Sequence, residues 1–307
     1  MRIVFMGTPD FAIPTLRMLL EDGHEVVAVV TAPDKPSGRG LKLKPSPVKA
    51  FAESQGLNIL QPVKLRNPEF VAALKDLTPD LAVVVAFRML PEMVWSIPSQ
   101  GTLNLHAALL PDYRGAAPLN WVIINGETET GGTTFLIDHK IDTGAMLLQR
   151  KLAIPEDWTA GDLHDSMMEF GAELVRDTVR GLAEGNIEPQ PQDHSKFLHP
   201  APKIFKEDCK IDWNKPAQEV YNFIRGLSPY PTAWTTLNGK SLKVFGASKT
   251  DCEGSVAPGT ADLQNGKLYV CCADAWLEIT KLQLEGKKRM ETESFLRGYK
   301  EEISHVG

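Results

Sequence analysis

The chain has 307 residues, of which 43% are hydrophobic and 23% charged, and this length and composition predict a globular protein of two domains. Its formal net charge of −6 argues against a protein that binds nucleic acid over its whole surface. No stretch approaches the roughly 20 apolar residues of a membrane helix, and the N-terminus lacks the pattern of a signal peptide. The four cysteines show neither a C-x-x-C pair nor zinc-ligand spacing, which predicts a reduced, cytoplasmic protein without a structural metal.

Apolar runs alternate with helical patterns in the first half of the chain. We expect buried strands at residues 2–7, 25–31, 80–87 and 101–106, and helices at 10–23 and 67–77. Continuous apolar strands between helices predict an α/β fold with a Rossmann-like, mostly parallel sheet that is covered on both faces. Such sheets bind ligands at the carboxyl ends of their strands. The turn after the first strand, MGTPDFA, lacks G-x-G-x-x-G, which argues against a dinucleotide site.

The second half of the chain has a different character. An amphipathic helix at 159–185 begins with a capping box of Thr159 and Asp162, and a proline-rich stretch without steady periodicity follows it. After one more helix come short segments of β type divided by glycine turns, typical of a small β-barrel that resembles an OB-fold. We therefore expect domains at 1–188 and 209–307, joined by an extended linker at 189–208.

The adjacent cysteines Cys271 and Cys272 fall in one of these short segments. Because neighbouring residues of a strand face opposite ways, we expect one of them to be buried and the other not.

The strand at 101–106 carries Asn104 and His106, which share one face because they are two residues apart. An amide donor and an imidazole at the carboxyl end of a strand can hold an oxygen that becomes negative during acyl transfer. Asp142, in a polar turn, is the candidate carboxylate to orient the imidazole. The same pattern is also compatible with a local hydrogen-bond network that has no catalytic role.

Basic residues gather in two places despite the negative net charge. Residues 35–52 include five basic residues and no acidic one, and a second run consists of Lys287, Lys288 and Arg289. Such a local group of basic residues can bind a polyanion, or it can be an ordinary solvent-exposed surface.

Ordered motifs across nearly the whole chain resemble one known family. NLHAALLPDYRGAAP at 104–118, followed by IDTG at 141–144, is similar to the folate-dependent formyltransferases. The further motifs resemble the methionyl-tRNA formyltransferase branch of that family, namely MGTPDFA at 6–12, DKPSGRGLKLKPSPVK at 34–49, DTGAML at 142–147 and SPYPTAW at 228–234.

The resemblance implies transfer of the formyl group of 10-formyltetrahydrofolate to the α-amine of methionyl initiator tRNA. We also expect a monomer that binds no metal. The resemblance implies catalysis by Asn104, His106 and Asp142, with the carboxylate raising the pKa of His106 so that a charged imidazole holds the oxyanion. The folate pocket falls on two segments and on the turn at 138–142; the two segments are Phe87, Arg88, Met89 and Leu90, and Ala108, Leu109, Leu110 and Pro111.

For tRNA, the resemblance implies contact through the basic loop of Lys35, Arg39, Lys42 and Lys44, with a further contribution from the second domain. Two positions depart from the family pattern, since Ala108 replaces a common serine and Arg88 a common glycine. The roles of Arg88, Arg114 and the run at 287–289 stay open. The alternatives are a formyltransferase for a nucleotide or sugar amine, a 10-formyltetrahydrofolate hydrolase and a noncatalytic RNA-binding module.

Overall fold

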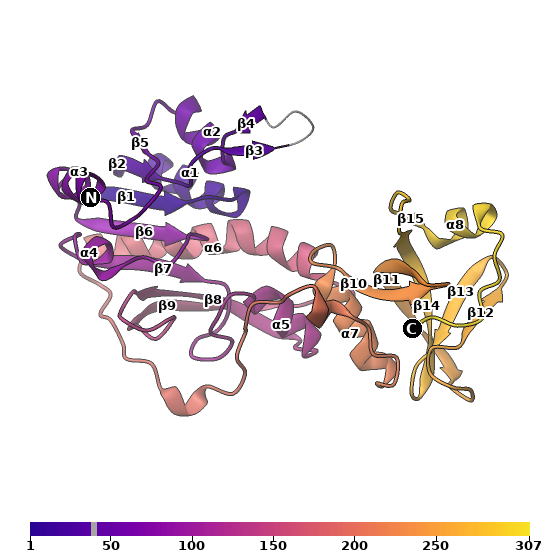
Figure 1. The fold of residues 1–307 in the computed structure, drawn as a ribbon. Coiled ribbons are helices and arrows are strands. Elements are labelled where there is room, and N and C mark those ends of the chain that lie inside the picture. The colour runs from indigo at the N-terminus through magenta and orange to yellow at the C-terminus, as the bar shows by residue number, and fades with distance from the viewer. Residues whose placement is uncertain (38–41) are drawn as a thin grey trace. The chain divides into compact units, whose positions relative to one another are not determined.

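The computed structural model describes residues 1–37 and 42–307, with only the backbone of Ser37 and Lys42. The chain divides into two compact units, each assembled from separate stretches (Figure 1): the first comprises 1–115, 131–152 and 164–200, and the second 116–130, 153–163 and 201–307.

The helices and strands of the first half are β1 (Arg2–Gly7), η1 (Asp10–Ala12), α1 (Ile13–Glu21), β2 (Glu25–Val30), β3 (Lys35–Ser37), β4 (Lys42–Lys44), α2 (Pro47–Ser54), β5 (Ile59–Leu60), α3 (Pro68–Asp76), β6 (Leu81–Val85), α4 (Glu92–Trp95), β7 (Thr102–His106), α5 (Pro118–Ile124), β8 (Glu129–Leu136) and β9 (Met146–Ala153). Those of the second half are α6 (Ala160–Ala183), η2 (His194–Lys196), η3 (Glu207–Cys209), α7 (Ala217–Leu227), β10 (Ala233–Leu237), β11 (Lys240–Glu253), β12 (Ala261–Gln264), β13 (Lys267–Cys271), β14 (Ala275–Leu284), β15 (Met290–Glu291) and α8 (Thr292–Gly298).

The first unit is built on a seven-stranded sheet in the order β5-β2-β1-β6-β7-β8-β9 (Figure 1). The strands from β5 to β7 pair in parallel, whereas β7 and β8 are antiparallel. The predicted α/β class with a mostly parallel sheet is therefore confirmed. The order reverses at β1, because β2 lies on one side of it and β6 on the other. A reversal of this kind opens a crevice at the carboxyl ends of the strands, where the loops after β6 and β7 begin.

The two faces of this sheet are covered by different helices. Val4 and Met6 of β1 join a buried cluster with Phe70 and Leu74 of α3 and Val94 of α4. On the opposite face, α6 packs closely on β7: a Cβ atom at Gly171 would lie 2.6 Å from the side chain of Leu105. Burial of both faces explains why the strands read as continuous apolar runs.

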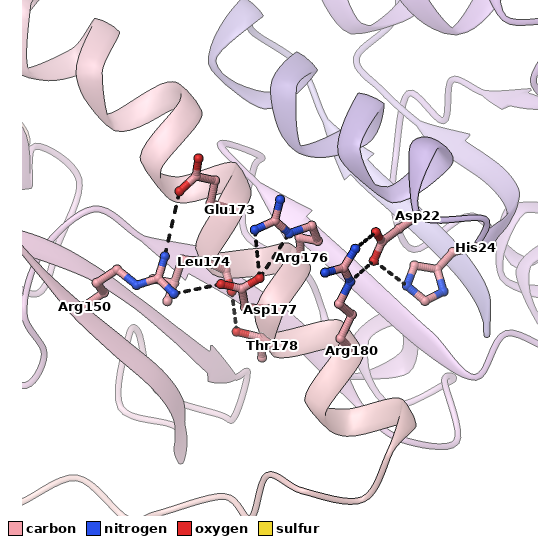
Figure 2. Close-up of polar contacts among 9 residues, drawn as sticks. All are labelled: Asp22, His24, Arg150, Glu173, Leu174, Arg176, Asp177, Thr178 and Arg180. Carbon is pink, nitrogen blue, oxygen red and sulfur yellow. Dashed lines mark hydrogen bonds and ion pairs between the residues drawn. The ribbon is translucent and has the colours of Figure 1, made fainter.

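Polar contacts attach α6 to its neighbours within the first unit (Figure 2). Arg180 donates to both carboxylate oxygens of Asp22, at the end of α1, and this pairing lowers the pKa of Asp22. Arg150 of β9 reaches Asp177 of α6 at 2.8 Å. The helix is thus fixed both to α1 and to the edge strand of the sheet.

Two helix starts form as their sequences predict. The side chain of Asn67 accepts a hydrogen bond from the main-chain N–H of Glu69 at the start of α3. At α6, Thr159 and Asp162 form the reciprocal capping box, in which each side chain accepts from the other residue's main-chain N–H at 3.2 and 2.8 Å.

The second unit contains a largely antiparallel sheet in the order β10-β11-β14-β13-β12, with β15 paired to β14. A C-terminal domain built on an antiparallel sheet after α7 is therefore confirmed, although β11 and β14 are longer than the short segments expected, with 14 and 10 residues. Its core includes Trp213, Val220 and Ile224 from outside the sheet. The expectation that Cys271 and Cys272 differ in burial is wrong. Both are fully buried, because β13 ends at Cys271 and the chain turns there, and burial raises the pKa of the Cys272 thiol to about 12.

Candidate functional site

Strand β7 presents its polar residues toward the face of the sheet that α4 covers. Thr102, on the same side of the strand, donates its hydroxyl to the main-chain oxygen of Trp95 in α4. Asn104 is half-buried, and its side chain makes no hydrogen bond with any other residue in the described part of the chain. The amide of Asn104 is therefore available to a ligand.

The imidazole of His106 is buried and has a different partner at each nitrogen. Its Nε2 lies 2.9 Å from the main-chain oxygen of Tyr113, and its Nδ1 lies 3.7 Å from Oδ2 of Asp142. A carbonyl oxygen only accepts hydrogen bonds, so Nε2 carries the proton of the neutral ring. Nδ1 is then the unprotonated nitrogen, and it is the one beside the carboxylate.

The net effect of these surroundings lowers the pKa of His106 below its ordinary value. Burial is the largest cause, and the nearby charge of Arg114 acts in the same direction, while Asp142 and the carbonyl of Tyr113 oppose it. The expectation that Asp142 raises the pKa of His106 is confirmed, but burial outweighs this effect, so the net shift is opposite to the one that a charged imidazole requires. The sequence shows the carboxylate, but it does not show that the ring is removed from water.

Asp142 lies in the turn between β8 and β9 and has a left-handed backbone, with φ of 55°. Its Oδ2 accepts a hydrogen bond from the main-chain N–H of Gly115 at 3.0 Å. The carboxylate therefore lies between the loop that contains Gly115 and the ring of His106. The turn also requires Gly144, because a Cβ atom there would lie 1.7 Å from the main-chain oxygen of Leu136. This close approach explains the glycine of the DTG motif.

The side chain of Arg114, whose role the sequence left open, contacts other residues of the same chain. Its Nε donates to the main-chain oxygen of Asp142 at 2.9 Å, and its Nη2 lies 2.5 Å from Oε1 of Gln192 and 2.9 Å from Nδ1 of His194. The guanidinium also covers the ring of Phe197, with its Cζ 5.4 Å from the ring centre. These contacts give Arg114 a structural role.

The loop after His106 is held by two polar side chains that sequence reasoning missed. The hydroxyl of Thr133 donates to the main-chain oxygen of Ala108 at 2.7 Å and accepts the N–H of Leu110 at 3.1 Å. Gln149 of β9 donates both to Thr133 and to the main-chain oxygen of Leu110, each at 2.9 Å. Ala108, Leu110 and Pro111 are buried and Leu109 is half-buried.

The segment after β6 begins at the same edge of the sheet as this loop. Leu90 belongs to the buried core cluster and Phe87 packs against it, whereas Met89 is 74% exposed. Arg88 donates to the main-chain oxygens of Pro62 and Val63. The side chain of Arg88 is therefore engaged with the loop after β5.

The predicted basic loop contains a two-stranded hairpin, β3 and β4. Lys35 and Lys44 are exposed and directly opposite each other across the two strands, and neither forms an ion pair with a described residue. Arg39 and the side chain of Lys42 lie outside the described residues. Lys49, by contrast, is paired with Asp34 at 2.6 Å and is not free for a ligand.

The second basic run, at residues 287–289, is exposed. Arg289 covers the ring of Phe245, with its Cζ 4.3 Å from the ring centre.

Within residues 1–37 and 42–307, no group of three or more histidine, cysteine or acidic side chains has an arrangement that could hold a metal ion. No helix in the same ranges is long and apolar enough to cross a membrane.

Comparison with known protein families identifies the family of this chain. The model of the family described as formyl transferase matches residues 1–179, and the model of the formyl transferase C-terminal domain matches residues 203–300. The chain belongs to the formyl transferase family. The resemblance seen in its motifs is confirmed, and the chain is an enzyme of the transferase class.

Relatives that match nearly the whole chain are methionyl-tRNA formyltransferases. The protein of Bacteroides fragilis is 50% identical over 309 residues, covering 97% of this chain and 95% of the relative. That of Pelobacter propionicus is 51% identical over 298 residues, covering 96% of this chain and 92% of the relative.

Solved structures share the fold at lower identity. The N-formyltransferase of Helicobacter canadensis, in complex with folinic acid and dTDP-3-aminofucose, has a TM-score of 0.68 at 19% identity, covering 94% of this chain and 100% of that one. HypX of Aquifex aeolicus, in complex with tetrahydrofolic acid, has a TM-score of 0.66 at 19% identity, covering 100% of this chain and 50% of that one.

Proposed function

We propose that this protein transfers the formyl group of 10-formyltetrahydrofolate to the α-amine of methionine on initiator tRNA, producing N-formylmethionyl-tRNA for translation initiation. The observation that carries the proposal is the group of Asn104, His106 and Asp142: an open amide and a buried imidazole with a carboxylate at one nitrogen. The near full-length relatives that are methionyl-tRNA formyltransferases support the choice of amine. The folate compounds bound in two structures of the same fold support the choice of donor.

Attack by the amine on the formyl carbon produces a tetrahedral intermediate whose oxygen carries a negative charge. The amide of Asn104 is assigned to that oxygen, because it is a hydrogen-bond donor without an internal partner in the described structure. A donor fixed on a strand costs little reorganisation when the charge develops, which is the condition for efficient stabilisation of an oxyanion.

The imidazole of His106 is assigned to proton transfer. In its neutral form, Nδ1 can take the proton that the attacking amine loses. The imidazolium formed in this way is stabilised by Asp142, 3.7 Å away. His106 then returns the proton to N10 as the bond from N10 to the formyl carbon breaks, so no covalent intermediate with the enzyme forms.

Folate is assigned to the edge of the sheet where the loops after β6 and β7 begin. Phe87, Arg88, Met89 and Leu90 follow β6, and the loop at 108–111 follows β7. For Leu90 and Ala108, which are buried, the contribution would be to shape the pocket. The bonds from Thr133 and Gln149 support this assignment, because they give the loop at 108–111 a fixed form before any ligand binds.

The tRNA is assigned to the basic hairpin. Like charges directly opposite each other destabilise a pair of strands, so Lys35 and Lys44 are unfavourable for the hairpin on its own. A phosphate backbone would relieve that repulsion. Arg39 and Lys42 belong to the same proposal on the basis of the sequence.

The direct test is formyl incorporation from 10-formyltetrahydrofolate into methionyl initiator tRNA. Free methionine, a nucleotide-linked amino sugar and water are the matched alternatives. The proposal predicts that the charged tRNA is the efficient acceptor and that formate release without an acceptor is slow. Preferential formylation of the sugar amine, or rapid formate release, would identify one of the alternative functions.

A further inference from the structure

Gln192 is a buried polar residue in the segment that follows α6, and the function described so far does not use it. Its exposed fraction is 7%, whereas its neighbours Pro191 and Asp193 are exposed. A glutamine buried alone in a proline-rich, mostly polar segment has a cost in desolvation unless its carboxamide is fully paired.

The carboxamide of Gln192 is paired at both ends, and all its partners belong to the catalytic site. Its Nε2 donates to the main-chain oxygens of Asp142 and Gly144, at 2.9 and 2.8 Å. Its Oε1 lies 2.5 Å from Nη2 of Arg114, whose Nε also donates to the oxygen of Asp142. Gln192 therefore joins the turn of Asp142 to the loop of Arg114.

The turn needs such support because Asp142 has a left-handed backbone, with φ of 55°. A residue other than glycine in this conformation is strained and persists only when its surroundings hold it there. Loss of the two bonds from Gln192 would allow the turn to relax, and the carboxylate of Asp142 would move relative to His106.

The same segment also holds the second partner of the imidazole. The main-chain oxygen of His199 accepts the N–H of Tyr113 at 2.8 Å. The carboxylate of Asp112 accepts from the N–H of Leu198 at 3.0 Å and lies 2.8 Å from Nδ1 of His199. The carbonyl of Tyr113 in turn accepts from Nε2 of His106. Both partners of His106 are thus anchored to residues 192–199.

We propose that Gln192 is a positioning residue for formyl transfer: through the main chain of Asp142, it holds the carboxylate against Nδ1 of His106. The expected effect on kcat rests on the proposed function. The position of the Asp142 carboxylate at His106 does not depend on that function. Gln192 does not touch the reacting atoms, so its effect acts through Asp142 and His106.

The test compares two variants with a matched control. Gln192→Glu keeps the length and the acceptor for Arg114 but removes the donors to Asp142 and Gly144, and Gln192→Leu removes every polar contact. The control is Gln190→Leu, because the side chain of Gln190 is exposed and only its main chain bonds to Met146.

For both Gln192 variants, we expect kcat to fall by roughly 10- to 100-fold, as for a small misplacement of a catalytic group, with KM unchanged for both substrates. Nitrogen-15 NMR of the imidazole of His106 should show the tautomer with protonated Nε2 in the wild type and in Gln190→Leu. In the Gln192 variants, the resonance of Nδ1 should shift, because the carboxylate beside this nitrogen moves when its turn loses the bonds from Gln192. A role in folding alone would lower the melting temperature without this spectral change.

Wild-type kcat and an unchanged imidazole spectrum in Gln192→Glu would overturn the inference, whether or not Gln192→Leu folds. If the wild-type protein does not formylate charged tRNA, the proposed function fails instead. The imidazole spectra would still decide whether Gln192 positions the site, so the two failures are distinguishable.

Discussion

The carboxylate of Asp142 lies 3.7 Å from Nδ1 of His106, yet the pKa of His106 is still below its ordinary value. Burial of the ring outweighs the attraction of the carboxylate, which is reduced further by Arg114. A lowered pKa favours the neutral ring at neutral pH, which is the form that the proposed proton transfer requires. In that proposal, the carboxylate acts when the proton arrives, by stabilising the imidazolium.

Replacing Asp142 with asparagine removes a negative charge that raises the pKa of His106, so this pKa falls further. In the proposed mechanism the free enzyme needs the neutral imidazole, so activity should disappear as the pH falls through the pKa of His106. The acidic limb of the profile of kcat/KM against pH should therefore move to lower pH, and kcat should fall because the imidazolium is no longer stabilised. Asp165→Asn, at an exposed position, is the control. A limb that moves to higher pH would contradict this account.

His106→Ala and Asn104→Ala should each lower kcat by roughly 10²-fold or more, as expected for loss of a proton-transfer group or an oxyanion donor. Binding of charged tRNA should change little, because neither side chain belongs to the basic hairpin. Steady-state kinetics and a tRNA-binding titration measure the two effects separately. Asn186→Ala, at an exposed position beyond α6, serves as the control. Turnover close to that of the wild type in both variants would remove these residues from the mechanism.

Thr133→Val replaces a hydroxyl by a methyl group of similar size and leaves the main-chain groups of Ala108 and Leu110 without their partner. We expect the free energy of unfolding to fall by about 1–3 kcal/mol and KM for the folate to rise. Thr130→Val, in the same strand, is a matched control, because the buried hydroxyl of Thr130 has no hydrogen-bond partner in the described structure. Chemical denaturation should show that only the first variant is destabilised. Equal stability of the two variants would mean that the loop does not depend on Thr133.

Lys35→Ala and Lys44→Ala should each raise KM for charged tRNA and leave KM for the folate unchanged. Each should also reduce the slope of log affinity against log salt concentration by about one. The exposed Lys75, which has no ion pair among the described residues, provides the control Lys75→Ala. A selective loss of folate affinity in the hairpin variants would instead indicate a lid over the folate.

The sequence was sufficient where local pattern decides the structure. The strand with Asn104 and His106 follows from its apolar run and from the two-residue period, and the starts of α3 and α6 follow from Asn67 and from Thr159 with Asp162. The motifs added the family. These features depend on residues close together in the chain or on long ordered matches.

The sequence was insufficient where contacts join distant residues. The contact of Arg88 with Pro62 and the support of the catalytic turn by Gln192 join segments separated by 26 and 50 residues. The direction of the pKa shift of His106 likewise depends on burial, which no local pattern of that strand reveals. Periodicity and motifs carry no information about such contacts.

The anchoring of Asp112 and Tyr113 to His199 has a consequence for where the catalytic region can be cut. A fragment that stops at Asp193 retains Asn104, His106 and Asp142, but it loses the residues that fix the carbonyl at Nε2 of His106. A fragment that extends to Pro200 retains them and ends where the first compact unit ends. Any fragment transplanted into another protein therefore has to include this tail if it is to keep the surroundings of His106, although the proposed catalytic side chains all lie well before it.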